Sequence, residues 1–104
     1  MAEIPFTKLL DLMSRQKACE ELSLIPGEVV TVRLNDGIVV RLDTKRQTVE
    51  GIDECLRSVI PARSQQELDA DEHTEFLVDY NENERFRVVV SGQADGVRVV
   101  IRRS

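Results

Sequence analysis

The side chains best suited to chemistry are arginines near the end of the chain, in residues 85–104. There arginine alternates with apolar residues in two runs, RFRVVV and VRVVIRR. Alternation with a period of two predicts two β-strands, each with one apolar face and one face that carries arginine. A guanidinium group is always charged and can donate two hydrogen bonds to one phosphate. The chemistry open to these residues is therefore the binding of an anionic group.

The two strands are expected to pair as an antiparallel hairpin. If its loop spans Gln93 to Gly96, the register places Arg87 directly opposite Arg102. A two-residue turn at Asp95–Gly96 would shift the register by two residues and keep both arginines on one face. Like charges on paired strands repel. The residues alone favour exposed arginines that pair loosely with nearby acids, and the alternative is a site that receives an anion.

Net charge and its distribution narrow the classes of partner. The chain has 104 residues, enough for one domain, and a net charge of −5. Nucleic acids and acidic membranes need a surplus of cations, so neither is an expected partner. One tyrosine, three phenylalanines and no tryptophan also leave little for base stacking. The charge is polarised, however, because residues 85–104 contain five arginines while residues 67–84 contain eight acids and no lysine or arginine.

Catalytic and metal-binding patterns are absent from the sequence. It contains no glycine-rich nucleotide loop of the GxxxxGKS, GxxxxGKT or GxGxxG type. His73 is the single histidine, and among acids on an expected turn it is interpreted as a solvated residue. The neighbouring acids lack the glycine and the ligand spacing of a calcium loop and are interpreted as a solvated face. No catalytic residue and no metal site is therefore predicted; the acids concerned are Glu67, Asp69, Asp71, Glu72 and Glu75.

Cysteine usage and hydropathy indicate a reducing compartment. Cys19 and Cys55 fit no metal or redox spacing and are expected to be small buried side chains. The sequence shows no N-terminal signal pattern, and no apolar run approaches the ~20 residues of a membrane span. The cytoplasm is the expected location, without insertion into the membrane.

The first half of the chain predicts a helix and then three strands. Pro5 suits the first turn of a helix, and residues 6–13 carry apolar side chains at i, i+3, i+4 and i+7. A strand is expected at residues 22–24. Residues 28–42 alternate on both sides of Asp36–Gly37, which predicts a hairpin with a two-residue type I′ turn.

The second half predicts two helices and three strands. Thr48 can cap a helix that Pro61 ends. Ser64 and Glu67 have the spacing of a capping box, which predicts a short third helix with Leu68 facing inward. Residues 75–80 are expected to form a strand before the arginine hairpin. The inner face of the first of these helices is expected to be Val49, Ile52, Leu56, Val59 and Ile60.

The resulting order, α-β-β-β-α-α-β-β-β, predicts an α+β fold. Strands joined by tight hairpins form an antiparallel sheet, and helices that cluster in mid-chain pack on one face of it. We find no internal repeat, low-complexity tract or linker, so residues 1–104 are expected to be a single domain.

The order of elements and several short strings resemble one family, the hexameric secretion and pilus motor ATPases. More closely, the chain resembles the N-terminal domain of the PilT-like retraction ATPases of type IV pili. Residues 9–24 are similar to the family's opening helix and its ASDLHL strand, and VRLNDG at 32–37 to its VR-x-DG hairpin. Thr74–Phe76 is similar to TDF, and Arg85–Val88 matches RFRV. The resemblance covers almost the whole chain.

The resemblance implies a PAS-like version of the α+β fold and a role for two arginines. In the family, two arginines of the N-terminal domain reach toward nucleotide phosphates that the catalytic domain holds. The matching positions are Arg87 and Arg102, which keep the family's separation. Three positions depart from the family pattern: Ser23 replaces a histidine, Glu21 replaces an aspartate, and Asn35 lengthens the turn.

The resemblance also implies what surrounds the domain. The catalytic domain with the Walker motifs is absent from this chain, so the chain alone is expected to be no enzyme. The full-length family protein is an ATPase that uses ATP and Mg, forms a cytoplasmic homo-hexamer and converts hydrolysis into the pilus disassembly that serves twitching motility. The partner of this domain would be the catalytic domain of the same or a neighbouring subunit. The alternative hypothesis is a free-standing PAS-like module that binds a partner protein or small ligand.

Overall fold

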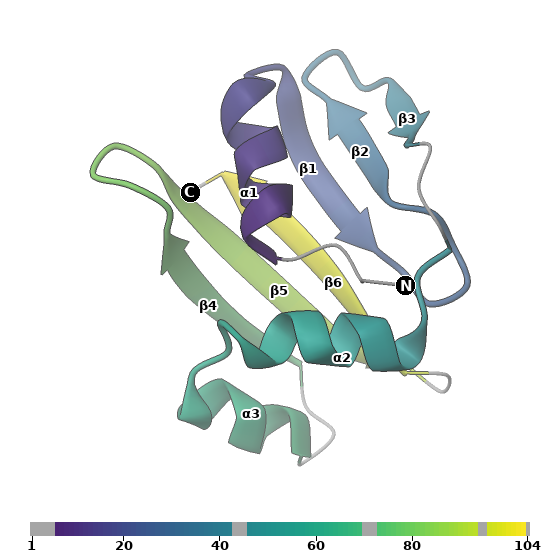
Figure 1. The fold of residues 1–104 in the computed structure, drawn as a ribbon, viewed down its shortest axis with the longest axis vertical. Helices are drawn as coiled ribbons and strands as arrows, with labels where there is room; N and C mark the ends of the chain where they lie inside the picture. The colour runs from purple at the N-terminus through teal and green to yellow at the C-terminus, as the bar shows by residue number, and fades with distance from the viewer. Residues whose placement is uncertain (1–5, 43–45, 70–72, 94–95, 104) are drawn as a thin grey trace.

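The computed structural model describes residues 6–42, 46–69, 73–93 and 96–103 (Figure 1). It confirms the predicted order of elements and the α+β class, with a six-stranded antiparallel sheet in the order β3-β2-β1-β6-β5-β4. The elements are α1 (Phe6–Arg15), β1 (Cys19–Leu24), β2 (Thr31–Leu34), β3 (Val39–Arg41), α2 (Val49–Arg57), α3 (Ala62–Asp69), β4 (Thr74–Asp79), β5 (Arg85–Gln93) and β6 (Gly96–Arg103).

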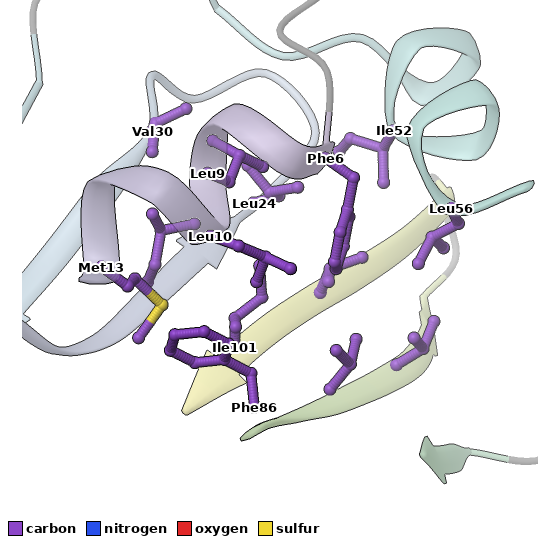
Figure 2. Close-up of a cluster of buried hydrophobic side chains, with 14 of the residues drawn as sticks. Phe6, Leu9, Leu10, Met13, Leu24, Val30, Ile52, Leu56, Phe86 and Ile101 are labelled. Carbon is purple, nitrogen blue, oxygen red and sulfur yellow. The ribbon is translucent and has the colours of Figure 1, made fainter. Parts of the chain in front are cut away.

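One face of the sheet is covered by helices. Figure 1 shows α1 and α2 lying across the same face, and α3 packs near β4 and β5. Figure 2 shows the core between these layers, where side chains of α1 and α2 point toward those of β5 and β6. Phe86, Val88 and Val90, the apolar alternates of β5, are fully buried. The period-two pattern therefore assigned the two faces of this strand correctly.

The register of the arginine hairpin is the one predicted for the longer loop. Arg87 pairs with Arg102 and Gln93 pairs with Gly96. The alternative Asp95–Gly96 turn is excluded by this pairing; Ala94 and Asp95 themselves lie outside the described residues. Pro5, expected in the first turn of α1, also lies outside them.

The first hairpin is correct but its predicted turn is wrong. Gly37 donates its backbone N–H to the Leu34 carbonyl (2.9 Å), and Leu34 donates to Ile38 (2.8 Å), so the loop has three residues rather than two. Gly37 has a φ of 88°, a conformation that favours glycine. The extra Asn35 is accommodated by this longer loop, which closes with a glycine in the left-handed region as three-residue hairpins commonly do.

Thr48 caps α2 as expected, but the helix ends earlier than predicted. The Thr48 hydroxyl accepts a hydrogen bond from the Gly51 N–H at 2.9 Å. The helix ends at Arg57, before Pro61 is reached, and the Val59 N–H then bonds to the Leu56 carbonyl, three residues back instead of the four of an α-helix. Val59 and Ile60 still pack against the core, as the helical stripe indicated.

Two further predictions about the helices are wrong. The apolar pattern predicts Val49 on the inner face of α2, but its position in the first turn leaves it 41% exposed. Ser64 does not cap α3: the Pro61 carbonyl accepts the Gln65 N–H at 3.0 Å, so the helix begins at Ala62 and Ser64 is buried inside it. The fixed φ of proline favours a helix start at this point.

Both cysteines were expected to be buried, and the structure confirms this for Cys19 only. Cys19 is buried and Cys55 is half-buried, and neither forms a disulfide. Burial raises the pKa of the Cys19 thiol. Among the helices described, none is long and apolar enough to cross a bilayer.

Candidate anion site on the open face of the sheet

The face of the sheet opposite the core carries charged side chains, with exposed apolar residues such as Leu77 and Val39 beside them. On β5 and β6, every second side chain points to this face, and the side chains between them point into the core. Arg87 and Arg102 are 51% and 56% exposed on this face. The structure therefore brings the two predicted residues together, directly opposite each other on neighbouring central strands.

Cross-strand pairing extends this arrangement into a row. Glu21 on β1 lies opposite Arg102, and Arg33 on β2 lies opposite Glu21. Leu77 on β4 lies opposite Arg87 at the other end. Three arginines and one glutamate thus occupy adjacent positions across neighbouring strands, and two of the arginines are directly paired.

Each of the two predicted arginines is held by an acid through its Nε atom. Arg102 Nε donates to Glu21 Oε2 at 2.9 Å, and Arg87 Nε lies 3.0 Å from Glu75 Oε1. Within the described part of the chain, Arg87 and Arg102 each make one ion pair. Each of these ion pairs is formed by the Nε atom of the arginine and not by a terminal Nη atom. The outer edges of both guanidinium groups are thus open to a further acceptor. A phosphate could meet both edges at once.

The sequence also favoured exposed arginines that pair loosely with nearby acids, and part of the arginine hairpin shows this arrangement. Arg87 pairs with Glu75, and Arg85 Nε donates to Asp79 Oδ1 at 2.6 Å, so both use acids from residues 67–84. Such exposed ion pairs are worth ~0–1 kcal/mol each. Arg98 is exposed opposite Ser91 and, in the ranges the structure describes, makes no ion pair.

Sequence reasoning missed Arg33 and the role of Glu21. Glu21 is only 14% exposed, and its Oε2 atom accepts from both Arg33 Nη2 (3.1 Å) and Arg102 Nε (2.9 Å). Arg33 also reaches Glu20 Oε1 at 3.1 Å. The carboxylate of Glu21 is therefore the counter-ion that links two of the three arginines in the row. The only feature of the sequence that indicated an outward-facing Arg33 was the alternation of apolar and polar residues in Val32–Leu34.

The remaining titratable candidates gather into no metal-binding group within the part of the chain that the structure describes. His73 is exposed, as expected. Glu67 accepts a hydrogen bond from the Thr74 hydroxyl at 3.2 Å, and Glu75 is used by Arg87. Asp71 and Glu72 lie outside the described residues, and elsewhere no group of three metal-binding side chains is found.

A second charged cluster, away from the open face, ties three elements together. Glu84 follows the β4–β5 turn, is 18% exposed, and accepts hydrogen bonds from Ser14 (2.6 Å) on α1 and Arg103 (3.3 Å) on β6. Arg103 also donates to the carbonyls of Met13 and Gln16 at the end of α1, where a cation is favoured by the helix dipole. This cluster was not predicted, because its members are distant in sequence.

We expect Glu84 to make stability fall in acid. The Ser14 hydrogen bond above all, with those from Asn81 and Lys17, lowers the pKa of Glu84 from 4.5 to about 2. Because the folded-state pKa lies below the unfolded one, this contribution is complete above pH 4.5 and is lost as the pH falls toward 2. Glu84→Gln should therefore lower the urea midpoint at neutral pH, and the difference from the parent chain should shrink in acid.

Urea titrations of both chains at a series of pH values will test this. Glu82→Gln is the matched control, since Glu82 is an exposed neighbour in the same turn. A Glu84→Gln difference that stays constant down to the acid limit would contradict the assignment of that pH dependence to Glu84.

Three comparisons with known proteins bear on identity. No family model matches the sequence, and no curated protein is significantly similar to it. Among solved structures, the pilus retraction motor PilT with bound ADP matches with a TM-score of 0.81 and 23% identity. The ATPase DotB of Legionella pneumophila matches with a TM-score of 0.80 and 11% identity, and that of Yersinia pseudotuberculosis with 0.63 and 15%.

The coverage of these matches is asymmetric. They include 96%, 99% and 94% of this chain, but only 29%, 30% and 29% of the matched chains. This chain therefore spans less than a third of the length of its structural neighbours. At these identities the likeness concerns the fold, which this chain shares over nearly its full length with one part of the PilT and DotB chains.

Proposed function

We propose that residues 1–104 are the N-terminal domain of a pilus or secretion motor ATPase, and that Arg87 and Arg102 face the phosphates of a nucleotide held by a catalytic domain. The observation that carries this proposal is the pairing of the two arginines on the open face, with their outer edges unused. The fold shared with ADP-bound PilT supports it. In this proposal the chain supplies the two phosphate-facing arginines, and the Walker motifs belong to the catalytic domain.

The proposed role of the two arginines is to stabilise the negative charge that develops on the phosphoryl group during its transfer. A guanidinium group that meets the transferring phosphoryl group stabilises the transition state. The arginines gain this partner only when the two domains close, so nucleotide state would bias the angle between domains. In the full-length protein, ATP and Mg would be bound by the catalytic domain, and a cytoplasmic homo-hexamer, at the inner face of the membrane, would couple the motion to a pilus or secretion machine.

The two acids fit this role. Glu21 and Glu75 hold the arginines by Nε and reduce their mutual repulsion while no phosphate is present. Because these contacts leave the Nη atoms unoccupied, a phosphate need not displace either acid. The isolated chain should nevertheless bind nucleotide weakly, since two exposed arginines supply few contacts and the entropic cost of association is large.

A titration of this chain with ATP, followed by NMR, will test the proposal. We expect weak binding without saturation in the micromolar range, with the side-chain N–H signals of Arg87 and Arg102 moving more than that of Arg98. Arg98 is an internal control because it lies on the same face without a paired arginine. Saturable micromolar affinity, or equal shifts at all three residues, would contradict the proposal.

The rival hypothesis of a free-standing module makes a different prediction for the gene beyond codon 104. Reading the natural reading frame onward separates the two directly. A Walker A motif downstream agrees with the motor proposal, whereas a stop codon would favour the module.

A further inference from the structure

Strand β3 forms one edge of the sheet, and within the described ranges no strand pairs with its outer side. Figure 1 shows β2 along one side of it. Leu34 donates its N–H to Ile38, and Leu42 donates to Val30, so alternate residues 38, 40 and 42 are bonded to β2. By the antiparallel pattern, the N–H and C=O groups of Val39 and Arg41 point away from β2. Such an edge can pair with another strand.

The same edge exposes apolar side chains. Ile38, Val39 and Val40 are 57%, 59% and 37% exposed, and they are consecutive in the chain. A groove of about 240 Å³ lies beside Val40, between the end of α1 and the β2–β3 hairpin. Apolar residues line most of it, among them Leu12, Val32, Leu34, Val40 and Leu42. Apolar side chains gathered on an exposed edge commonly mark a contact surface.

We propose that β3 pairs antiparallel with β3 of a second copy of this chain, about a two-fold axis at Val40. In this register Val39 of each copy lies opposite Arg41 of the other. All four outward backbone groups of each strand are then paired, because the two residues that point outward meet each other. Val40 meets Val40 of the partner, and Ile38 meets Leu42, so the apolar residues of both copies join beside the two grooves.

The two neighbouring registers of the β3–β3 pair are less favourable, one in its electrostatic repulsion and the other in its backbone hydrogen bonds. A two-fold axis at Arg41 would place two arginines face to face, where like charges repel. An axis at Val39 would set Arg41 opposite Gly37, whose N–H already bonds to Leu34 within the hairpin. The register centred on Val40 alone avoids both penalties, so a second copy of this chain fits the edge in one defined arrangement.

This contact is independent of the proposed function. A two-fold axis relates two subunits symmetrically, whereas a single ring of identical subunits is built from head-to-tail contacts. The β3 contact would therefore join domains of separate assemblies. With only a short strand on each side, it should be weak and depend on concentration.

Disulfide trapping at the two-fold axis will test the proposal even if association is weak. In a non-hydrogen-bonded antiparallel pair the two Cα atoms lie about 4.5 Å apart, within the range of about 4.4–6.8 Å that a disulfide spans. In a Cys55→Ser background, Val40→Cys should form a covalent dimer readily in oxidised glutathione. Leu77→Cys is the matched control, an apolar residue 48% exposed on β4 at the opposite edge. Equal dimer yields from the two variants would overturn the proposal.

A charge change tests the register separately by sedimentation at several concentrations. Val39→Glu places a carboxylate opposite Arg41 of the partner twice, and two such cross-strand pairs should strengthen dimerisation by about two- to thirtyfold. Val40→Lys sets two lysines face to face on the axis and should abolish the dimer. Unchanged association in both variants, with circular dichroism showing folded protein, would refute this register.

Discussion

Replacing Arg87 or Arg102 by alanine in the full-length protein should lower ATP turnover by about a hundredfold or more, with the domain still folded. Removing one preorganised donor to a developing negative charge commonly costs about 10²–10³ in kcat, and arginines that meet a transferring phosphoryl group contribute at least as much. The fold should tolerate the change because both side chains are half exposed and their ion pairs are worth ~0–1 kcal/mol. Steady-state ATP hydrolysis and thermal unfolding of each variant will measure the two effects.

Two further variants distinguish specific contact with phosphate from a general effect of positive charge on this face of the sheet. Arg98→Ala removes an arginine from the same face of β6 and should leave turnover nearly unchanged. Arg87→Lys keeps the charge but loses the planar fork, so it should recover only part of the activity. If Arg87→Ala and Arg102→Ala both hydrolyse ATP at the parent rate, the assignment of these residues to phosphate is wrong.

The arginine pair was predictable because its determinants are local. Period-two alternation fixes which residues of one strand share a face, and loop length fixes the register of a hairpin. Arg87 and Arg102 therefore met across β5 and β6 as expected. Their counter-ion Glu21 was not predictable, since it lies 81 residues from Arg102 and meets it only because β1 pairs with β6. Hydrophobic periodicity does not encode the order of strands in a sheet.

Burial at the sheet edge was equally beyond local reasoning. The predicted two-residue turn would have paired Val32 with Arg41, whereas the three-residue loop pairs Val32 with Val40 and places both on one face. Val32 is buried while Val40 is 37% exposed, because the groove between α1 and the β2–β3 hairpin is open on the side of β3. Periodicity therefore predicts which residues of one strand share a face, whereas loop length sets the register between strands and the placement of the covering helix decides which residues are buried.

Phe86→Ala should destabilise the domain by ~3–5 kcal/mol, a large part of the ~5–15 kcal/mol that holds a small domain folded. Phe86 is fully buried, and its ring lies edge-on to that of Tyr80 (6.1 Å between centroids, 72°) and under the Arg103 guanidinium at 5.8 Å. Figure 2 shows it gathered with Leu10 and Met13 of α1. Alanine would leave a cavity where the helix layer meets β5. Urea unfolding followed by circular dichroism will measure the loss.

Phe86 and Arg87 are adjacent on β5 and point to opposite faces, so their alanine variants should differ in kind. Phe86→Ala should lower the free energy of unfolding and reduce ATP turnover only through the unfolded fraction, whereas Arg87→Ala should reduce turnover in fully folded protein. Leu77→Ala controls for loss of an apolar side chain from an exposed position of the neighbouring strand and should cost less than ~0.5 kcal/mol. A Phe86→Ala loss no larger than that of Leu77→Ala would mean that the helix layer does not pack on β5 as described, and the face assignment of Arg87 would fail with it.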